Sequence, residues 1–350
     1  MLQTKDTRIA NNFDIIRIIF AWFVILSHSF ILNGEGPTDP LAKLTNGYLI
    51  FSFIGVKGFF IISGYLIMQS LVRSYSVADY LLKRVLRIFP GLLVLLLLTI
   101  LAVYFIYPLQ KGSFYIFEPS VYKYFLWNSI LVSPIYFING IFDHQSSHAI
   151  NGSLWTIEFE FLFYILLLAL YPWRKNKVVL KITLITLIIF LISGNVLFLE
   201  KIKTITSPIT LEFIFDLGTY FMMGALISCF DWEAIPFKKI IFFIALLILL
   251  IATYYKLHYS FVHISLPYLI IYLGNQSSAI AKKTHEILGD PSYGIYLYGF
   301  PVQQFLIYFF KPSTTQLIIT STFISFAIGY CSWKWIEKKA LRYKNLFISK

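Results

Sequence analysis

Ten long apolar windows constrain this chain more than any other feature of its sequence. About 20 apolar residues allow an α-helix to cross the roughly 30 Å hydrocarbon core of a membrane. The windows predict an all-α, polytopic membrane protein: a bundle of about ten transmembrane helices in one integral-membrane domain over residues 1–350, with a core at about 13–340. They lie at about 12–33, 47–71, 85–108, 153–172, 181–199, 208–230, 239–256, 260–275, 291–310 and 314–335.

Composition supports the same class and sets the orientation. Hydrophobic residues make up 58% of the chain and charged residues 13%, which is far from a soluble domain. The net charge of +12 is typical of some nucleic-acid-binding proteins, but the Lys and Arg residues are divided by side: one alternate set of loops and termini holds 20 and the other holds 7. By the positive-inside rule both termini are cytoplasmic, and the charge indicates membrane topology with no nucleic-acid partner.

The first apolar window carries three ionisable residues, Asp14, Arg17 and His28. Helical geometry places Arg17 and His28 on one face to within about 20°, with a rise of about 16 Å between them. Ionisable groups inside a membrane span are costly, and they mark functional sites or pathways. The alternative for Arg17 is a snorkelling pair with Asp14 near the start of the helix.

Two further arginines, Arg84 and Arg87, stand at the expected cytoplasmic mouth of the third window. With Arg17 they place three guanidinium groups on one side of the membrane. Arginine forks bind phosphate oxygens in a bidentate manner, so this cluster suits a cytoplasmic phosphorylated donor. The alternative is that basic residues here only follow the positive-inside rule.

Three residues are expected at a similar depth near the outer face. Helix rise places His28 about 8 Å, Glu160 about 10 Å and Asp216 about 12 Å from that face. A histidine held by a carboxylate is the minimal set for general-base chemistry on a hydroxyl. The alternative is that each residue is separately buried and satisfied by neighbouring polar groups.

The window at 47–71 contains Lys57 near mid-membrane and the pair Ser63-Gly64 closer to the cytoplasm. Glycine here indicates close helix packing, and a nucleophilic Ser63 would need a nearby base that depth estimates do not supply. Lys57 requires an intramembrane acid that the sequence does not identify. The long connection 109–152 contains the stretch DHQSSH, which we interpret as a solvated loop and not as a metal site, because it lacks a third strong ligand.

Five motifs occur in one order along the chain. They read FDIIRIIFAWFVILSHS, FFIISGYLI, KRVLRIFPG, NGSLWTIEFEFLFY and SYGIYLYGFPVQQ. In this combination the chain resembles acyltransferase family 3, a family of integral membrane O-acyltransferases. The resemblance implies transfer of an acyl group, usually acetyl from cytoplasmic acetyl-CoA, to a hydroxyl of an extracytoplasmic or lipid-linked carbohydrate. It implies no permanently bound cofactor.

The resemblance also implies roles for particular residues. Arg17 and His28 match the family's Arg/His motif, with His28 as the essential histidine, Arg84 and Arg87 match its RxxR segment, and Glu160 matches the glutamate after the Trp-Ser/Thr pair. We therefore expect His28, Glu160 and Arg17 to be catalytic, and Arg84, Arg87 and Arg17 to bind the donor. Weaker candidates for substrate binding are Asp14, Trp155, Asp216, Lys57, Ser63, Tyr293 and Tyr296.

Two departures from the family pattern bear on mechanism. Gly299 stands where many members carry a histidine in YLYGFP, so that histidine is not required here. A soluble esterase-like domain found in other members is also missing, so we expect transfer to finish in the membrane bundle or with a glycan-assembly protein.

The implied protein is a multi-pass O-acetyltransferase of the bacterial inner membrane, surrounded by membrane lipid. Succinyl or another acyl donor remains an alternative, as does a non-enzymatic glycan or small-molecule transporter that uses the same charged residues along a pathway.

Overall fold

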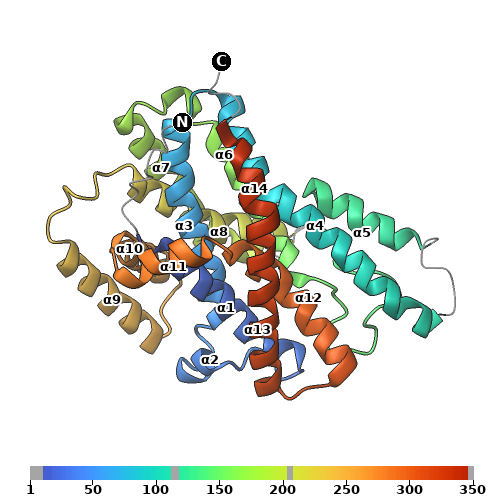
Figure 1. Cartoon of the computed structure of the whole chain (residues 1–350). Coiled ribbons are helices and arrows are strands. Elements are labelled where there is room, and N and C mark those ends of the chain that lie inside the picture. Colours follow the sequence, from blue (N-terminus) through green and yellow to red (C-terminus); the bar gives the residue numbers. More distant parts are fainter. Residues whose placement is uncertain (1–10, 112–117, 203–207, 346–350) are drawn as a thin grey trace.

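The apolar windows fold into helices, and no strand occurs in the part of the chain that the structure describes. This computed structural model describes residues 11–111, 118–202 and 208–345, with side chains placed for 11–106, 118–196 and 211–344. The expected all-α class is therefore confirmed (Figure 1). The first helices are α1 (Phe13–Leu32), α2 (Pro40–Leu44), α3 (Phe51–Arg73), α4 (Val77–Lys111), α5 (Pro119–Ile130), α6 (Trp155–Leu168) and α7 (Lys177–Ile202).

The second half of the chain is equally helical. It contains α8 (Pro208–Ser228), α9 (Lys238–Tyr254), α10 (Ser260–Asn275), α11 (Ala279–Leu288), α12 (Ser292–Phe310), α13 (Thr314–Ser332) and α14 (Lys338–Ala340), followed by the short 3₁₀ segment η5 (Leu341–Asn345). The chain ends 1–10 and 346–350, whose cytoplasmic location was expected, lie outside the described residues.

Six helices in the described residues are long and apolar enough to cross a membrane. They are Phe13–Leu32, Phe51–Arg73, Val77–Ile106, Lys177–Val196, Leu211–Ser228 and Thr314–Lys344. The other four predicted windows form α6, α9, α10 and α12. The first three of these have only 14, 17 and 16 residues, and α12 has 19 residues but a lower hydropathy because it includes Gln303 and Gln304.

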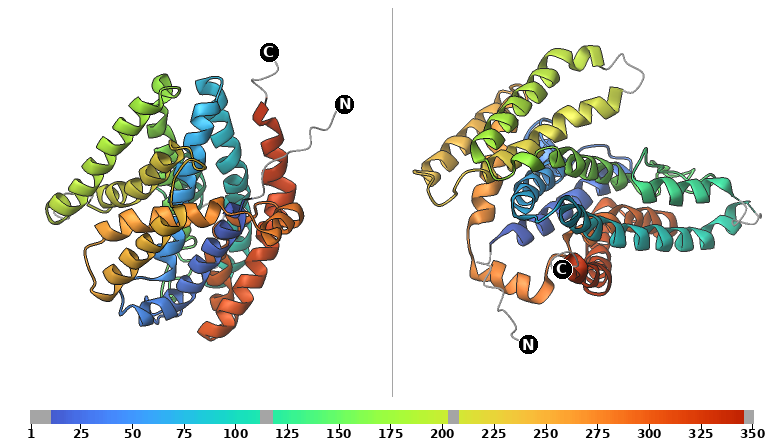
Figure 2. Two further views of the ribbon diagram at one scale, coloured as in Figure 1. Left: turned by 90° about the vertical axis from the view of Figure 1, so that its left-hand side faces the viewer. Right: turned by 90° about the horizontal axis from the view of Figure 1, so that it is seen from above.

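Helix α3 is central to the bundle, packing against α1, α6, α8 and α10 (Figure 2). Its crossing with α8 is close because Gly64 faces the Phe221 carbonyl and Gly224 faces the Ile61 carbonyl, so that a Cβ at either glycine would overlap backbone atoms. The packing role expected for Gly64 is confirmed. Small residues at such crossings let helix backbones approach in a membrane, where van der Waals contact stabilises the pair.

The bundle has two recognisable ends. At the mouth end, uppermost in Figure 1, α3 finishes at Arg73, α4 begins at Val77, and α14 approaches. At the far end, α1 finishes at Leu32, and the Asn33 side chain donates to the Pro312 carbonyl in the turn between α12 and α13. Helices α4 and α5 form a hairpin that projects to one side, whereas α9 and α10 pack together on the other (Figures 1 and 2).

The long connection before α6 differs from a surface loop. It contains α5, and its last residues enter the bundle interior, where Asn151 and Ser153 are almost completely buried. The Asn151 side-chain amide donates to the Leu297 carbonyl at 3.0 Å, and its oxygen accepts from the Ser153 backbone N–H at 2.9 Å. Helix α6 therefore begins inside the protein, although a membrane-crossing helix was expected to begin at the outer face.

Candidate active site

An internal cavity of about 570 Å³ extends from the mouth end into the bundle between α1, α3, α4, α6, α12 and η5. Basic side chains gather in its wall together with one carboxylate, that of Glu160. The wall is formed by Arg17, Val56, Phe59, Phe60, Ser63, Leu66, Ile67, Ser70, Arg73, Lys83, Arg84, Arg87, Ile88, Thr156, Ile157, Glu160, Tyr164, Ser292, Tyr293, Tyr296, Leu341 and Lys344. The expected gathering of Arg17, Arg84 and Arg87 is confirmed.

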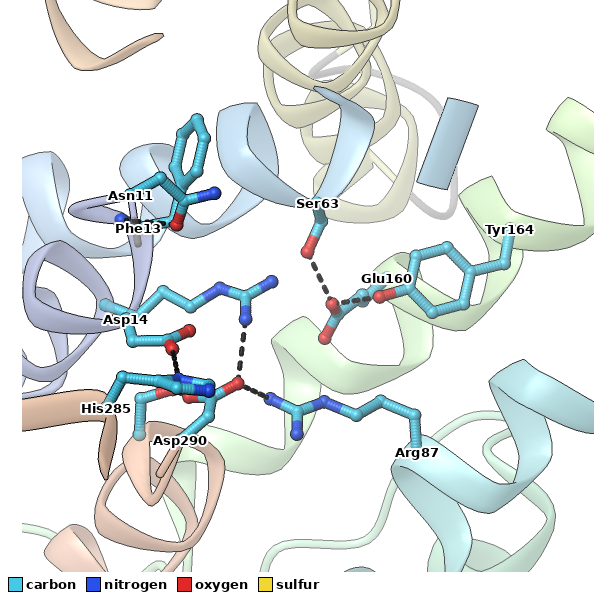
Figure 3. Close-up of polar contacts among 11 residues, drawn as sticks. Asn11, Phe13, Asp14, Ser63, Arg87, Glu160, Tyr164, His285 and Asp290 are labelled. Atoms are coloured by element: carbon cyan, nitrogen blue, oxygen red, sulfur yellow. Dashed lines mark hydrogen bonds and ion pairs between the residues drawn. The ribbon is translucent and has the colours of Figure 1, made fainter. Parts of the chain in front are cut away.

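Two of these arginines share one carboxylate, that of Asp290 (Figure 3). Arg17 Nη1 and Arg87 Nη2 lie 2.8 Å and 2.6 Å from the same oxygen, Oδ2, and the Ser292 hydroxyl donates to Oδ1. Burial alone would raise the pKa of Asp290, but the charges of Arg87 and Arg17 outweigh it and hold that pKa well below its usual range. Asp290 is thus ionised and holds both guanidinium groups in place.

Arg84 differs from its two neighbours because no carboxylate lies within ion-pair distance of it in the described residues. Its Nη2 donates to the Ser70 hydroxyl at 3.3 Å, its guanidinium lies over the rings of Tyr80 and Tyr164, and its buried Nε has no partner there. Of the three arginines, Arg84 therefore keeps the most hydrogen-bonding capacity for an anion inside the cavity.

Glu160 lies at mid-cavity, where its Oε1 accepts hydrogen bonds from Ser63 Oγ at 2.7 Å and from Tyr164 Oη (Figure 3). This corrects the depth that we predicted, because Glu160 is level with Ser63 and is not paired with His28. The reason is the interior start of α6, which moves Glu160 toward the mouth end. Glu160 is thus the hydrogen-bond acceptor beside Ser63, a neighbour that the depth estimates did not supply.

The inner end of the cavity is formed by α6, α12 and α3. Thr156 Oγ1 and Tyr296 Oη are 2.6 Å apart, and both side chains are buried. The Tyr296 ring meets the Phe59 ring edge-on, with centroids 5.6 Å apart. Tyr293, closer to the mouth, donates its hydroxyl to the Ile88 carbonyl at 2.9 Å. Both tyrosines that the sequence analysis proposed for substrate binding therefore line the cavity.

His28 lies beyond that inner end and is not part of the cavity wall. Its ring packs edge-on against Phe300, with centroids 5.3 Å apart, and neither imidazole nitrogen has a hydrogen-bond partner in the described part of the chain. Phe300 in turn packs against Gly152, where an added Cβ would lie 2.6 Å from the ring. On α12, Phe300 follows Tyr296 by one helical turn, about 6 Å. His28 is therefore close to the cavity but separated from it by aromatic side chains.

The remaining sequence candidates lie outside the cavity wall. Asp14 pairs with His285 at 2.5 Å instead of with Arg17, and Trp155 packs on Phe213 with ring centroids 4.2 Å apart. The corrected position of Asp14 follows from α11, whose approach to α1 brings His285 within reach.

Lys57 and Asp216 form a separate buried cluster with His263. Lys57 Nζ lies 2.6 Å from Asp216 Oδ2, and His263 Nε2 lies 3.0 Å from Asp216 Oδ1. Asp216 is the acid that the sequence could not identify for Lys57. Sequence reasoning did not single out His263 or Asp290; the available signals were a histidine within an apolar window and an acid directly before one.

The fold and the cavity define a polytopic membrane protein with a basic internal site of the size that holds a small molecule. A family model described as an acyltransferase domain matches residues 11–334, and the chain belongs to this family, acyltransferase family 3, as its motifs predicted. It is an O-acyltransferase enzyme.

Two curated relatives support the assignment. An "O-acetyl transferase" of Shigella phage Sf6 is 30% identical over 349 residues, which cover 95% of this chain and 96% of that protein. "Nodulation protein 10" of Rhizobium leguminosarum bv. viciae is 35% identical over 173 residues, covering 48% of this chain and 46% of the relative. No solved structure gives a significant match.

Proposed function

We propose that this membrane O-acetyltransferase takes an acetyl group from cytoplasmic acetyl-CoA and transfers it to a hydroxyl of a surface polysaccharide or lipid-linked glycan. The mouth end of the bundle would face the cytoplasm of a bacterium, in agreement with the excess of Lys and Arg in the loops of that side. The similarity to the phage O-acetyl transferase over nearly the whole of both chains supports acetyl as the group transferred.

The observation that carries the proposal is the match between the cavity and the phosphopantetheine arm of coenzyme A. Arg84 is level with Ser70, and Ser63 lies about 10 Å further in along α3. Glu160 is bonded to Ser63, and Thr156 lies about 6 Å beyond Glu160 along α6. These two distances add to about 16 Å from the level of Arg84 to that of Thr156. The phosphopantetheine chain has about 13 bonds between phosphorus and thioester sulfur, and its reach of roughly 15 Å agrees with this distance.

This fit gives each level of the cavity a role. Arg84 would bind the pyrophosphate, while Arg17 and Arg87, held by Asp290, would add positive potential without changing position. Ser63, Glu160 and Tyr164 offer hydrogen-bonding groups at the level of the pantetheine amides. The thioester would then lie against Thr156 and Tyr296.

His28 would act as the general base for the acceptor. An acceptor hydroxyl transfers its proton to His28 while its oxygen attacks the thioester carbon; the C–O bond forms, the C–S bond breaks, and the thiolate recovers the proton from the imidazolium. Phe300 packs against the His28 ring beyond the inner end of the cavity, so the Phe300 ring must move during transfer. The His28 imidazole has no competing hydrogen-bond partner among the described residues, which suits this role.

The experiment compares the purified protein in nanodiscs with variants at the two ends of the proposed transfer path, Arg84 at the donor end and His28 at the acceptor end. Arg84→Gln is expected to weaken acetyl-CoA binding about 10- to 150-fold, because a charge-assisted hydrogen bond contributes about 1.5–3 kcal/mol. Lys339→Gln, which removes an exposed cation near the same end, is the matched control. Calorimetric titration with acetyl-CoA measures both.

His28→Ala should leave acetyl-CoA binding intact and remove O-acetyl signals from the proton NMR spectrum of purified surface glycan. Complementation of a gene deletion by each variant provides the comparison. Near wild-type acetylation by His28→Ala would refute the role of His28 as general base. Unchanged acetyl-CoA affinity in Arg84→Gln would refute the cavity as the donor site.

A further inference from the structure

We propose that the inner end of the donor cavity is a ruler for the acyl chain, in which Phe59, Tyr296 and Thr156 restrict the donor to short acyl groups. This inference rests on the proposed function, because it takes the cavity as the site of an acyl-CoA. It assigns the choice between acetyl and longer acyl groups to particular side chains.

The first support is position. Phe59 precedes Ser63 by one turn of α3, and Thr156 precedes Glu160 by one turn of α6, so both lie about 6 Å inward from the Ser63–Glu160 hydrogen bond. With the pyrophosphate at Arg84, this is the level that the thioester reaches. The acyl chain, which continues from the thioester, therefore points directly at this wall.

The second support is rigidity. Tyr296 is 8% exposed, its hydroxyl is held by Thr156 Oγ1 at 2.6 Å, and its ring is held edge-on by Phe59. Thr156 is in turn anchored to the Ser153 carbonyl at 3.2 Å, in the buried segment that leads into α6. A side chain fixed on both its polar and its apolar parts is expensive to displace, so the wall keeps its position against a flexible acyl chain.

The third support is what lies behind the wall. The next layer is Phe300 packed on Gly152 and on the His28 ring. A long acyl chain would have to pass Tyr296 and would then fill the space that the acceptor hydroxyl must cross to reach the thioester. Short acyl groups leave that space free.

The test is an acyl-CoA chain-length profile measured by release of free CoA thiol, with the acceptor supplied as membranes from the deletion strain. Wild type is expected to use acetyl-CoA at least about 100-fold better than octanoyl-CoA, since pockets discriminate by about 10- to 200-fold for a single misplaced methylene. Phe59→Ala should raise the ratio of butyryl to acetyl turnover about 10-fold or more. Tyr296→Leu should shift the ratio in the same direction. It replaces Phe59→Ala as the test variant if Phe59→Ala does not fold.

Leu66→Ala is the matched control, because Leu66 lines the same cavity about 10 Å closer to the mouth than Phe59. It enlarges the cavity without moving the wall, and we expect the wild-type chain-length preference. Equal use of acetyl- and octanoyl-CoA by wild type, or an equal shift in Leu66→Ala and Phe59→Ala, would overturn the ruler and leave the proposed function standing. No turnover of any acyl-CoA by wild type would overturn the proposed function, and the ruler with it.

Discussion

The ion pair between Lys57 and Asp216 yields a quantitative prediction about the stability of the bundle. Lys57 Nζ and Asp216 Oδ2 are 2.6 Å apart, and their side chains are 10% and 20% exposed. At an effective dielectric constant of about 20 their attraction is roughly 6 kcal/mol, an upper bound because desolvation opposes it. Removing one partner strands the other charge, which costs about 3–5 kcal/mol for a buried pair.

The two single substitutions should differ. Lys57→Met leaves Asp216 with His263 at 3.0 Å, whereas Asp216→Leu leaves Lys57 with aromatic rings, the nearest being Phe53 at 3.7 Å from Nζ. We therefore expect Asp216→Leu to be the more destabilising. The double variant should recover much of the loss, because an apolar pair of similar volume often replaces a buried ion pair without net cost.

The assay is thermal unfolding in detergent, followed with a thiol-reactive dye that labels the buried Cys229 in a Cys331→Ser background. The single variants should unfold about 6–20 °C earlier than the background, on a scale of about 2–4 °C per kcal/mol. Lys123→Met, at an exposed lysine, should shift the midpoint by about 1 °C or less. Single-variant shifts below about 2 °C, or a double-variant shift equal to the sum of the singles, would refute the reasoning.

Three further predictions concern packing, charge and the buried segment before α6. Gly224→Ala should strongly reduce the yield of folded monomer in size-exclusion chromatography, because its Cβ overlaps the Ile61 carbonyl, while Gly218→Ala on the same helix, with nearest contacts at 3.4 Å, should be tolerated; equal yields would contradict the close crossing. The low pKa of Asp290 makes its stabilising effect complete above the unfolded Asp value of about 3.9 and lost only as pH falls through the lower folded value, so the difference in unfolding midpoint between wild type and Asp290→Asn should be the same at about pH 5 and pH 8. A difference that disappears by pH 5 would contradict this assignment. Asn151→Ala removes both hydrogen bonds of its side chain, so unfolding should need about 1–3 kcal/mol less and proteolysis between 131 and 152 should accelerate; unchanged stability and proteolysis would contradict the anchoring role.

The fold class and the gathering of arginines could be predicted from the sequence because both follow from local rules. Apolar windows must become helices in a membrane, since no other open structure satisfies the backbone there. Basic residues at one side bring Arg17, Arg84 and Arg87 to the same end of the bundle. The close packing of Gly64 follows from the absence of a side chain.

The pairing of charged residues could not be predicted, because it depends on where helices cross and begin. Depth estimates assume that each span starts at a membrane face, and α6 starts inside the protein, which moves Glu160 from the level of His28 to that of Ser63. The partner of Lys57 depends on the α3–α8 crossing, and Asp290 lies in the short link between α11 and α12. Neither position leaves a periodic signal in the sequence.

The buried segment before α6 joins two tasks in consecutive residues. Asn151 and Ser153 fasten the end of the long connection inside the bundle, and Thr156 follows within one turn. A displacement of that connection is carried along a few peptide bonds to Thr156, which lies at the level proposed for the thioester. Swapping this connection between relatives is therefore expected to change how the donor is handled, although the connection is remote in sequence from the arginines of the cavity.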